Sequence, residues 1–322
     1  MAFFNRRLRV ALDVYDKQTS DLLRQRNLAL SSSYDKMWVN DGKIQNRGFE
    51  ATIDADIIST LDWHLGSTFV FSMNRNKVKD LGNTVESGLM TDEMTGMLYE
   101  YSGNSLEQYR DYTNILAIGK PVNVFYGYRV NGIVQTVNEG IDAGLTGDYA
   151  QPGEFKYMDL DGNGSINEGD KCIIGDPNPD FTASLNLDLT WKNWNLNVFL
   201  NGVFGNDVLN TQKFGQPNSD PLRWTKDNPT NDYPSLRDGR QTKISDWWIE
   251  DGSFLRIQNV TLGYTFNFKK SILNKLHLYA NVANLYTFTS FKGYDPEVGL
   301  NGIYSGGYPR LRKWTFGLDL TF

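Results

Sequence analysis

The stretch Arg312-Lys-Trp-Thr-Phe-Gly-Leu-Asp-Leu-Thr-Phe322, which ends the sequence, decides the fold class. From Trp314 to Phe322 every second residue is apolar, and Thr, Gly or Asp fills the positions between. Because successive side chains of a β-strand point to opposite faces, one face of this segment is apolar and the other is polar. A tilted strand of about ten residues is long enough to cross a bilayer. The segment therefore predicts a transmembrane β-strand with one face in lipid.

The same alternation recurs in seven other segments, so it is a property of the whole chain. The eight segments are 8–14, 49–55, 63–73, 181–191, 195–201, 260–266, 276–282 and 314–322. Their connections alternate between long ones, at 17–43, 75–180, 205–252 and 288–311, and short ones, at 58–61, 192–193 and 267–275. Transmembrane barrels have short periplasmic turns and long outer loops, whereas a soluble sandwich has no reason to gather its long loops at one end. We therefore expect an all-β fold, an antiparallel transmembrane β-barrel with long extracellular loops.

Two details complete this prediction. Residues 122–133 also look strand-like, but a ninth crossing would break the up-and-down order, so we expect them inside the outer loop 75–180. Aromatic residues gather at predicted strand ends, where a membrane-interface girdle would place them and where simple edge packing is the alternative. These residues are Trp63, Trp191, Trp194, Tyr264, Phe266 and Trp314.

The composition excludes several classes of protein. The 32 basic and 38 acidic residues give a net charge of -6, and no basic stripe marks a nucleic-acid surface. Cys172 is the single cysteine, so an intrachain disulfide is impossible. Only two histidines occur, and no motif of a hydrolase, metalloprotease or phosphate-binding loop is found. We therefore expect neither a nucleic-acid partner nor enzymatic activity.

The start of the sequence conflicts with an outer-membrane location. Residues 1–10 lack the apolar region of a signal peptide, and no run approaches the ~18 apolar residues that a spanning helix needs. A chain that began here could not reach the outer membrane. We therefore expect that a further N-terminal part precedes this sequence in the complete protein.

Residues 159–170, Asp-Leu-Asp-Gly-Asn-Gly-Ser-Ile-Asn-Glu-Gly-Asp, match an EF-hand-type calcium loop in spacing. The expected ligands are the side chains of Asp159, Asp161, Asn163 and Asp170 and the backbone carbonyl of Ser165. Gly164 permits the sharp turn that such a loop requires. The pattern departs from an EF-hand in having Asp170 in place of a bidentate Glu and in lacking evident flanking helices. A polar turn that binds nothing is the alternative to a Ca²⁺ site.

Several aromatic residues fall in the predicted outer loops and are candidates for ligand binding. Trp224, Trp247, Trp248 and Tyr304 could stack on sugar rings or contact a partner protein. The alternative is that each one packs inside its own loop, because large loops need apolar cores as well.

Several runs, taken together, resemble the C-terminal region of SusC/RagA-like TonB-dependent outer-membrane transporters. The shortest are Asn46-Arg-Gly-Phe-Glu50, Ala283-Asn-Leu-Tyr-Thr-Phe-Thr289, Gly293-Tyr-Asp-Pro-Glu297 and the terminal Trp-Thr-Phe-Gly-Leu-Asp-Leu-Thr-Phe322. Three longer runs lie at 119–133, 159–181 and 251–264, of which Pro-Asn-Pro-Asp-Phe181 and Ser-Phe-Leu-Arg256 are the most specific parts. The likeness covers nearly the whole chain in order.

The resemblance implies the last eight strands of a 22-stranded barrel, in the cell outer membrane, with residues 1–322 all belonging to that barrel. It implies import of glycans or peptides with a SusD-like surface lipoprotein as partner and with energy from the TonB complex. It also implies that Phe322 is the terminal aromatic signal that the barrel-assembly machinery reads. The family's plug domain, TonB-contacting segment and signal peptide have no counterpart in this sequence.

Two other functions stay open from the sequence alone. One is an autonomous eight-stranded outer-membrane barrel, because eight strands are enough for closure. The other is a secreted carbohydrate-binding β-domain with a calcium loop. On the transporter hypothesis, the isolated chain should be poorly soluble, because unpaired strand edges and a lipid-facing apolar surface would be exposed to water.

Overall fold

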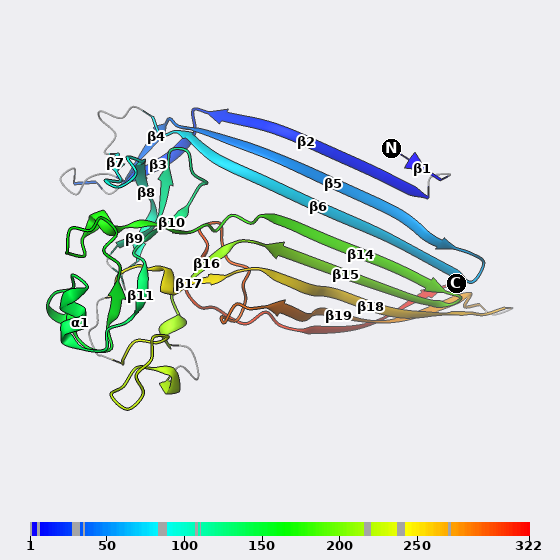
Figure 1. The fold of residues 1–322 in the computed structure, drawn as a ribbon. Helices are drawn as coiled ribbons and strands as arrows, with labels where there is room; N and C mark the ends of the chain where they lie inside the picture. The colour runs from blue at the N-terminus through cyan, green and yellow to red at the C-terminus, as the bar shows by residue number, and fades with distance from the viewer. Residues whose placement is uncertain are drawn as a thin grey trace.

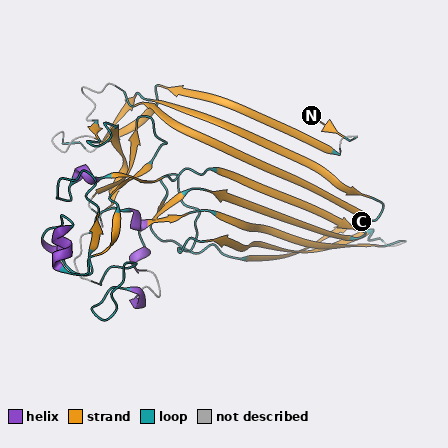
Figure 2. Cartoon of the chain, viewed as in Figure 1, coloured by secondary structure: helices purple, strands orange, loops and turns teal. Residues whose placement is uncertain are grey.

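The computed structural model consists mainly of one large antiparallel sheet with a mass of loops at one end (Figures 1 and 2). It describes residues 2–4, 7–27, 33–34, 36–82, 89–106, 109, 111–215, 220–236, 242–269 and 272–322. No helix in this described part of the chain combines the length and the apolar character that a membrane span requires.

The large sheet has nine strands in the order β1-β2-β5-β6-β14-β15-β18-β19-β21. Their bounds are β1 Ala2–Phe3, β2 Leu8–Ser20, β5 Lys43–Ser59, β6 Trp63–Asp80, β14 Phe181–Trp191, β15 Trp194–Phe204, β18 Phe254–Asn267, β19 Lys275–Thr289 and β21 Lys313–Thr321. All eight alternating segments lie in this sheet, with only the short β1 added. The predicted all-β antiparallel fold is therefore confirmed.

The strands connect as an up-and-down meander whose short turns gather at one end. The turn between β14 and β15 is only Lys192 and Asn193, and Lys192 has a positive φ of 54°, as tight two-residue hairpins require. The turn between β5 and β6 is closed by Thr60, whose Oγ1 accepts from the Trp63 backbone N–H at 3.0 Å. The four long connections, 21–42, 81–180, 205–253 and 290–312, gather at the opposite end of the sheet (Figure 1).

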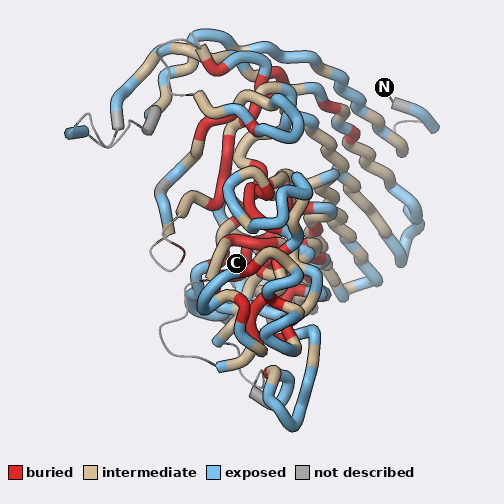
Figure 3. Tube along the Cα trace, turned by 60° about the vertical axis from the view of Figure 1, so that its left-hand side comes forward, coloured by how far each residue is buried: buried red, intermediate tan, exposed pale blue. Residues whose placement is uncertain are grey.

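The sheet is open at both edges. Strands β1 and β2 form one edge and β21 forms the other, and no pairing between the two edges exists among the described residues. The closed eight-stranded barrel that the sequence left open as an alternative is therefore not the arrangement observed. The sheet is a curved wall (Figure 3).

The four long connections fold together into a structure that we call the cap. It contains a five-stranded sheet in the order β13-β10-β9-β8-β7, a three-stranded sheet β17-β16-β20 and the pairs β11-β12 and β3-β4. The strands are β3 Leu23–Asn27, β4 Lys36–Asn40, β7 Met90–Thr91, β8 Leu98–Leu106, β9 Asp111–Ala117, β10 Val124–Gly127, β11 Val130–Ile133, β12 Phe155–Tyr157, β13 Cys172–Gly175, β16 Asp207–Asn210, β17 Ile249–Asp251 and β20 Ile303–Tyr304. The helix α1 spans Val137–Asp142, and 3-10 turns span Gly147–Ala150, Glu168–Asp170, Lys213–Gly215, Asp220–Leu222 and Asp246–Trp248. The strand-like residues 122–133 thus lie in cap sheets and not in the wall.

The buried core lies mostly in the cap (Figure 3). One cluster of buried residues includes Phe125, Leu209 and Trp248, and another includes Tyr128, Ile133 and Phe155. The wall, by contrast, leaves many large apolar side chains exposed, including Phe316 at 75%. The two parts of the chain therefore differ, because the cap buries most of its large apolar side chains and the wall leaves many of its own exposed.

Candidate functional site at the outer end of the sheet

One face of the wall is a hydrogen-bonded array of amides and carboxylates. Asn197 Nδ2 donates to Asn186 Oδ1 at 2.9 Å and to Asp188 Oδ1 at 2.7 Å. Farther across the sheet, Asn281 Nδ2 donates to Asn259 Oδ1 at 2.7 Å. Because these side chains satisfy one another across neighbouring strands, this face can border water or another polar surface.

The other face is apolar along the same strands. Leu189 pairs with Leu65 and Leu196, so leucines lie side by side on three neighbouring strands. The row continues across the sheet through Leu262, Ala280 and Phe316. A continuous exposed apolar surface of this kind is rare on soluble monomers and typical of a lipid-facing barrel wall.

Two rows of aromatic side chains bound this apolar face. The row beside the short turns contains Trp63, Trp191, Trp194 and Tyr264. The ring centroids of Trp63 and Trp191 are 5.4 Å apart, and those of Trp194 and Tyr264 are 4.7 Å apart. The row near the cap contains Phe71, Phe181 and Phe204, spaced 5.5 and 4.8 Å. Trp191 and Phe181 are ten positions apart on β14, which corresponds to about 33 Å along a strand. At a tilt of about 40° the separation across a membrane is about 25 Å, the height of a lipid-facing band.

All four long connections are tied together in the cap. Strand β16 pairs in parallel with β20, which joins 205–253 to 290–312. Tyr128 forms a bridge to Ser245, which joins 81–180 to 205–253. Arg24 in 21–42 forms an ion pair with Glu100 in 81–180. The cap is therefore one connected structure at the end of the wall opposite the short turns.

The structure places the three predicted tryptophans in or against the cap core. Trp248 is only 2% exposed and packs edge-on against Tyr109 at 5.3 Å. Trp247 is half-buried and donates its Nε1–H to the Asp232 carbonyl at 2.7 Å. Trp224, also half-buried, donates to Gln135 Oε1 at 2.7 Å. Burial favours a packing role for Trp248, and ligand binding by the three tryptophans stays a prediction.

Tyr304 is 7% exposed and belongs to a small cluster with Phe291, whose ring lies 5.2 Å away. Its hydroxyl accepts a hydrogen bond from the Tyr294 backbone N–H at 3.1 Å. Tyr304 thus presents only an edge toward solvent and holds the neighbouring turn in place. Its predicted contact with a ligand stays a prediction.

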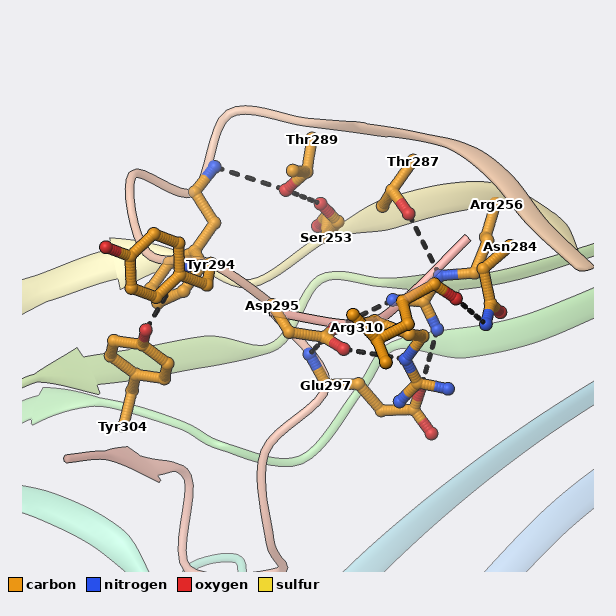
Figure 4. A network of polar contacts seen from close by, with 12 residues as sticks. Ser253, Arg256, Asn284, Thr287, Thr289, Tyr294, Asp295, Glu297, Tyr304 and Arg310 are labelled. Carbon is orange, nitrogen blue, oxygen red and sulfur yellow. Dashed lines mark hydrogen bonds and ion pairs between the residues drawn. The ribbon is translucent and has the colours of Figure 1, made fainter. Parts of the chain in front are cut away.

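The sequence did not single out a polar group of this region that we call the arginine clamp, which is centred on the buried Arg256 (Figure 4). Arg256 of β18 is 1% exposed, and its guanidinium donates to Asp295 Oδ1 at 2.7 Å and to Glu297 Oε2 at 2.6 Å. Arg310 reaches the same two carboxylates, at 2.7 and 2.8 Å. Thr287 of β19 accepts from Arg256 Nε at 2.9 Å. The clamp thus fastens 290–312 to strands β18 and β19.

The only signal for this clamp in the sequence is the set of runs quoted above. Arg256 ends Ser-Phe-Leu-Arg, and Asp295 and Glu297 lie in Gly-Tyr-Asp-Pro-Glu. Asp295 thus comes from a second segment, 39 positions after Arg256. Periodicity places Arg256 on a strand but does not reveal its partner across the loop.

In the predicted calcium loop, Asp159 organises the turn. Its Oδ1 accepts from the Gly162 backbone N–H at 2.7 Å, and its Oδ2 accepts from that of Gly164 at 2.8 Å. Both glycines have positive φ, 73° and 82°, which is the left-handed region that such a sharp turn requires. The hydrogen bonds from Gly164 and Gly162 hold the pKa of Asp159 below its ordinary value.

Three of the predicted ligands come together in this loop. Carboxylate oxygens of Asp159, Asp161 and Asp170 all lie within 4.8 Å of one another. Asp170 is fully buried, and its two oxygens accept from the Leu160 and Asn167 backbone N–H groups at 2.8 Å each. A carboxylate has about four lone-pair sites, so both oxygens retain the capacity to bind a cation.

The remaining predicted ligands lie in the same turn. Asn163 Oδ1 accepts from the Ser165 backbone N–H at 2.9 Å, and Asn163 Nδ2 donates to Asp161. Asn163 is therefore engaged within the loop. The last three residues of the loop, Glu168–Asp170, form a short 3-10 turn in place of the helix of an EF-hand.

Phe322 follows β21 directly and is 73% exposed, at the same end of the wall as the short turns. Its predicted role as an assembly signal stays a prediction. The single cysteine, Cys172, is half-buried in β13 of the cap, where burial raises the pKa of its thiol.

Comparison with known proteins identifies relatives over the whole chain. The TonB-dependent receptor P3 of Formosa agariphila is 34% identical over 347 residues, covering 100% of this chain and 33% of the receptor. The TonB-dependent receptor SusC of Bacteroides thetaiotaomicron is 28% identical, covering 99% of this chain and 31% of its own length. The chain thus spans about a third of the length of the curated relatives it matches. No protein-family model matches it.

Among solved structures, a chain of the RagAB peptide transporter aligns with 100% of this chain at a TM-score of 0.78 and 23% identity, over 34% of its own length. The same importer in its closed-closed state gives a TM-score of 0.75. These similarities concern the fold. The curated relatives are receptors by name, in agreement with the expectation that the chain is not an enzyme.

Proposed function

We propose that this chain, which is similar along its whole length to TonB-dependent receptors including SusC, forms the barrel wall and outer mouth of a nutrient importer. The observation that carries the proposal is a wall with one apolar face about 25 Å high, one polar face and a folded cap at one end only. The outer membrane is the location that both the wall and the relatives support.

The finer parts of the proposal concern cargo and partners. We propose that the cargo is a glycan or a peptide and that a SusD-like surface lipoprotein covers the cap. Energy would come from the TonB complex through parts of the receptor beyond these residues. The cap supports this proposal because its loops form one connected surface, on which a partner could seat without displacing the wall.

The orientation of the wall can be tested in intact cells with a thiol-reactive label that does not cross membranes. The full receptor, with Cys172→Ser as background, would carry either Lys226→Cys in the cap or Asn193→Cys in a short turn. We expect labelling of K226C in intact cells and of N193C only after the outer membrane is permeabilised. Labelling of N193C in intact cells, or recovery of the receptor in the soluble fraction, would overturn the proposal.

Import itself can be tested in a strain that has no other receptor of this family. Cells expressing the complete receptor should accumulate either labelled oligosaccharides or labelled oligopeptides, and a protonophore should abolish the accumulation. Cells expressing the receptor without residues 1–322 should accumulate neither. Equal accumulation in both strains would contradict the proposed function.

We further propose that the loop 159–170 binds Ca²⁺ through Asp159, Asp161 and Asp170, with Asn163 and the Ser165 carbonyl completing the site. The proximity of three carboxylates supports it, since each would otherwise repel the others. Extracellular calcium modules bind with Kd of about 10⁻⁴–10⁻³ M, which suits an outer loop.

Removal of Ca²⁺ should therefore loosen the cap. With Ca²⁺ at a few millimolar, limited proteolysis of the cap should be slower than in EDTA, by the several-fold that a ligand above its Kd confers. Asp161→Asn should abolish this difference, and Asp142→Asn, an exposed carboxylate at the end of α1, should not. Identical digestion with and without Ca²⁺ would argue for the polar turn that binds nothing.

A further inference from the structure

A pocket of about 290 Å³ lies in the cap beside Tyr304. Its polar and aromatic lining comes from Gln212, Lys292, Tyr294 and Tyr304. Gly306 and Gly307 also line the pocket, and because they carry no side chains they leave that side of the pocket open. Typical small-molecule sites occupy about 300–1,000 Å³, so this pocket holds one sugar or amino-acid unit rather than a whole oligomer.

The pocket has a surplus of positive charge. The Lys292 side chain is exposed and makes no ion pair with the residues that the structure describes. Lys213 lies nearby, 3.9 Å from Glu250, whose other oxygen accepts from the Lys292 backbone N–H at 3.1 Å. Burial lowers the pKa of Lys213, Glu250 opposes this effect, and the charge of Lys292 lowers the pKa further. Among the described residues, Glu250 thus pairs with the ammonium group of Lys213, and the ammonium group of Lys292 has no carboxylate partner.

Tyr294 gives the pocket an apolar surface at a fixed place. Tyr294 as a residue is 66% exposed, and its backbone N–H donates a hydrogen bond to the Tyr304 hydroxyl at 3.1 Å. The next residue, Asp295, is fastened by both arginines of the clamp (Figure 4). The ring thus stands on an anchored backbone, which lowers the entropic cost of stacking against a ligand.

We propose that this pocket binds a carboxylate-bearing unit of the imported substrate, with the carboxylate on Lys292 and Gln212 and the apolar face of the unit on Tyr294. The proposal rests on the proposed import function and names the class of its substrate. An acidic sugar and the C-terminal residue of a peptide share this chemistry. Lys292 and Tyr294 would then determine specificity, and the clamp residues would position them.

The test uses the complete receptor in detergent and ligand-observed NMR titration with matched probes. Glucuronic acid is compared with glucose, and N-acetylphenylalanine with its amide. At least one carboxylate should bind about tenfold more tightly than its neutral partner, as a charge-assisted hydrogen bond provides. The pair that shows this preference identifies the source, a sugar acid or a peptide end.

Variants assign the preference to the pocket. Lys292→Met should remove the carboxylate preference, Lys292→Arg should retain it, and Tyr294→Ala should weaken the acid and the neutral probe alike. Lys226→Met, an exposed lysine elsewhere in the cap, is the control and should change nothing. No preference for either acid, or equal losses in K292M and K226M, would overturn the proposal.

The import assay separates this result from the proposed function. If cells accumulate cargo but K292M binds all probes as the wild type does, the pocket assignment fails alone. If the purified receptor shows the Lys292-dependent preference but cells accumulate nothing, the import function fails and the site remains.

Discussion

At the scale of single residues, Arg256 has the largest predicted effect. Its charge is almost fully removed from water, and its guanidinium is compensated by Asp295 and Glu297 and lies over the Phe254 ring at 4.8 Å. Removing one member of such a buried group leaves an uncompensated charge, which costs about 3–5 kcal/mol. The clamp therefore stabilises the cap only while it is complete.

We expect Arg256→Met to destabilise 290–312 by about 3 kcal/mol, measured as faster proteolytic cleavage of this segment in the detergent-solubilised receptor. Arg75 also pairs with a carboxylate, Asp180 at 2.6 Å, but both side chains are more than half exposed. Arg75→Met is thus the matched control and should cost less than about 1 kcal/mol. Equal cleavage rates in the two variants would show that the burial of Arg256 is without energetic effect.

The same clamp predicts a pH dependence. Burial tends to raise the pKa of Asp295, but the hydrogen bonds from Arg310 and the Glu297 backbone and the two arginine charges hold it below the ordinary value. A carboxyl with a lowered folded pKa stabilises the fold above its ordinary pKa, about 3.9, and loses this contribution as pH falls through the lower folded value. Cleavage of 290–312 should be constant from pH 5 to 8 and increase below about pH 4.

At the scale of elements, the wall strands run farther than their alternation predicts. Strands β5 and β6 contain 17 and 18 residues, while the alternating segments end near Phe49 and Met73. Apart from Ile44 and Val78, the cap-side parts of these strands are polar. They are held by pairs such as Arg47–Asp16 at 3.0 Å and Asn74–Asn46 at 3.1 Å. Because these parts lack a continuous apolar face, the alternation in the sequence does not show where the strands end.

The two faces of β14 should respond oppositely to a charge. Leu185 and Ser184 are neighbours at nearly the same depth between the aromatic rows, and they point to opposite faces. In vesicles, Leu185→Arg should cost about 2–4 kcal/mol because it places a charge in lipid. Ser184→Arg adds the same side chain on the polar face and should cost far less. Urea titration of the vesicle-inserted receptor measures both, and equal costs would contradict the assignment of faces.

At the scale of the whole molecule, the sequence predicted the wall well and the cap poorly, for a physical reason. A strand between lipid and a polar lumen must alternate apolar and polar residues, and barrel connections alternate in length. Trp314 to Phe322 could therefore be recognised as a strand without knowing which strands pair with it. The cap has no such constraint, because its cores are built from residues far apart in the chain. The sequence did not reveal, for example, that Trp248 packs against Tyr109 from another loop.

The shared core of the cap has a consequence for the order in which the molecule is made. Phe125, Leu209 and Ile303 come from three different connections and pack in one cluster. Until all three connections are present, the apolar side chains of the other two have no complete cover. Because Ile303 follows β19 in the chain, the cluster is complete only when the chain extends beyond β19. A chain that ended after β19 would therefore lack β21 of the wall and would carry an incomplete, protease-sensitive cap.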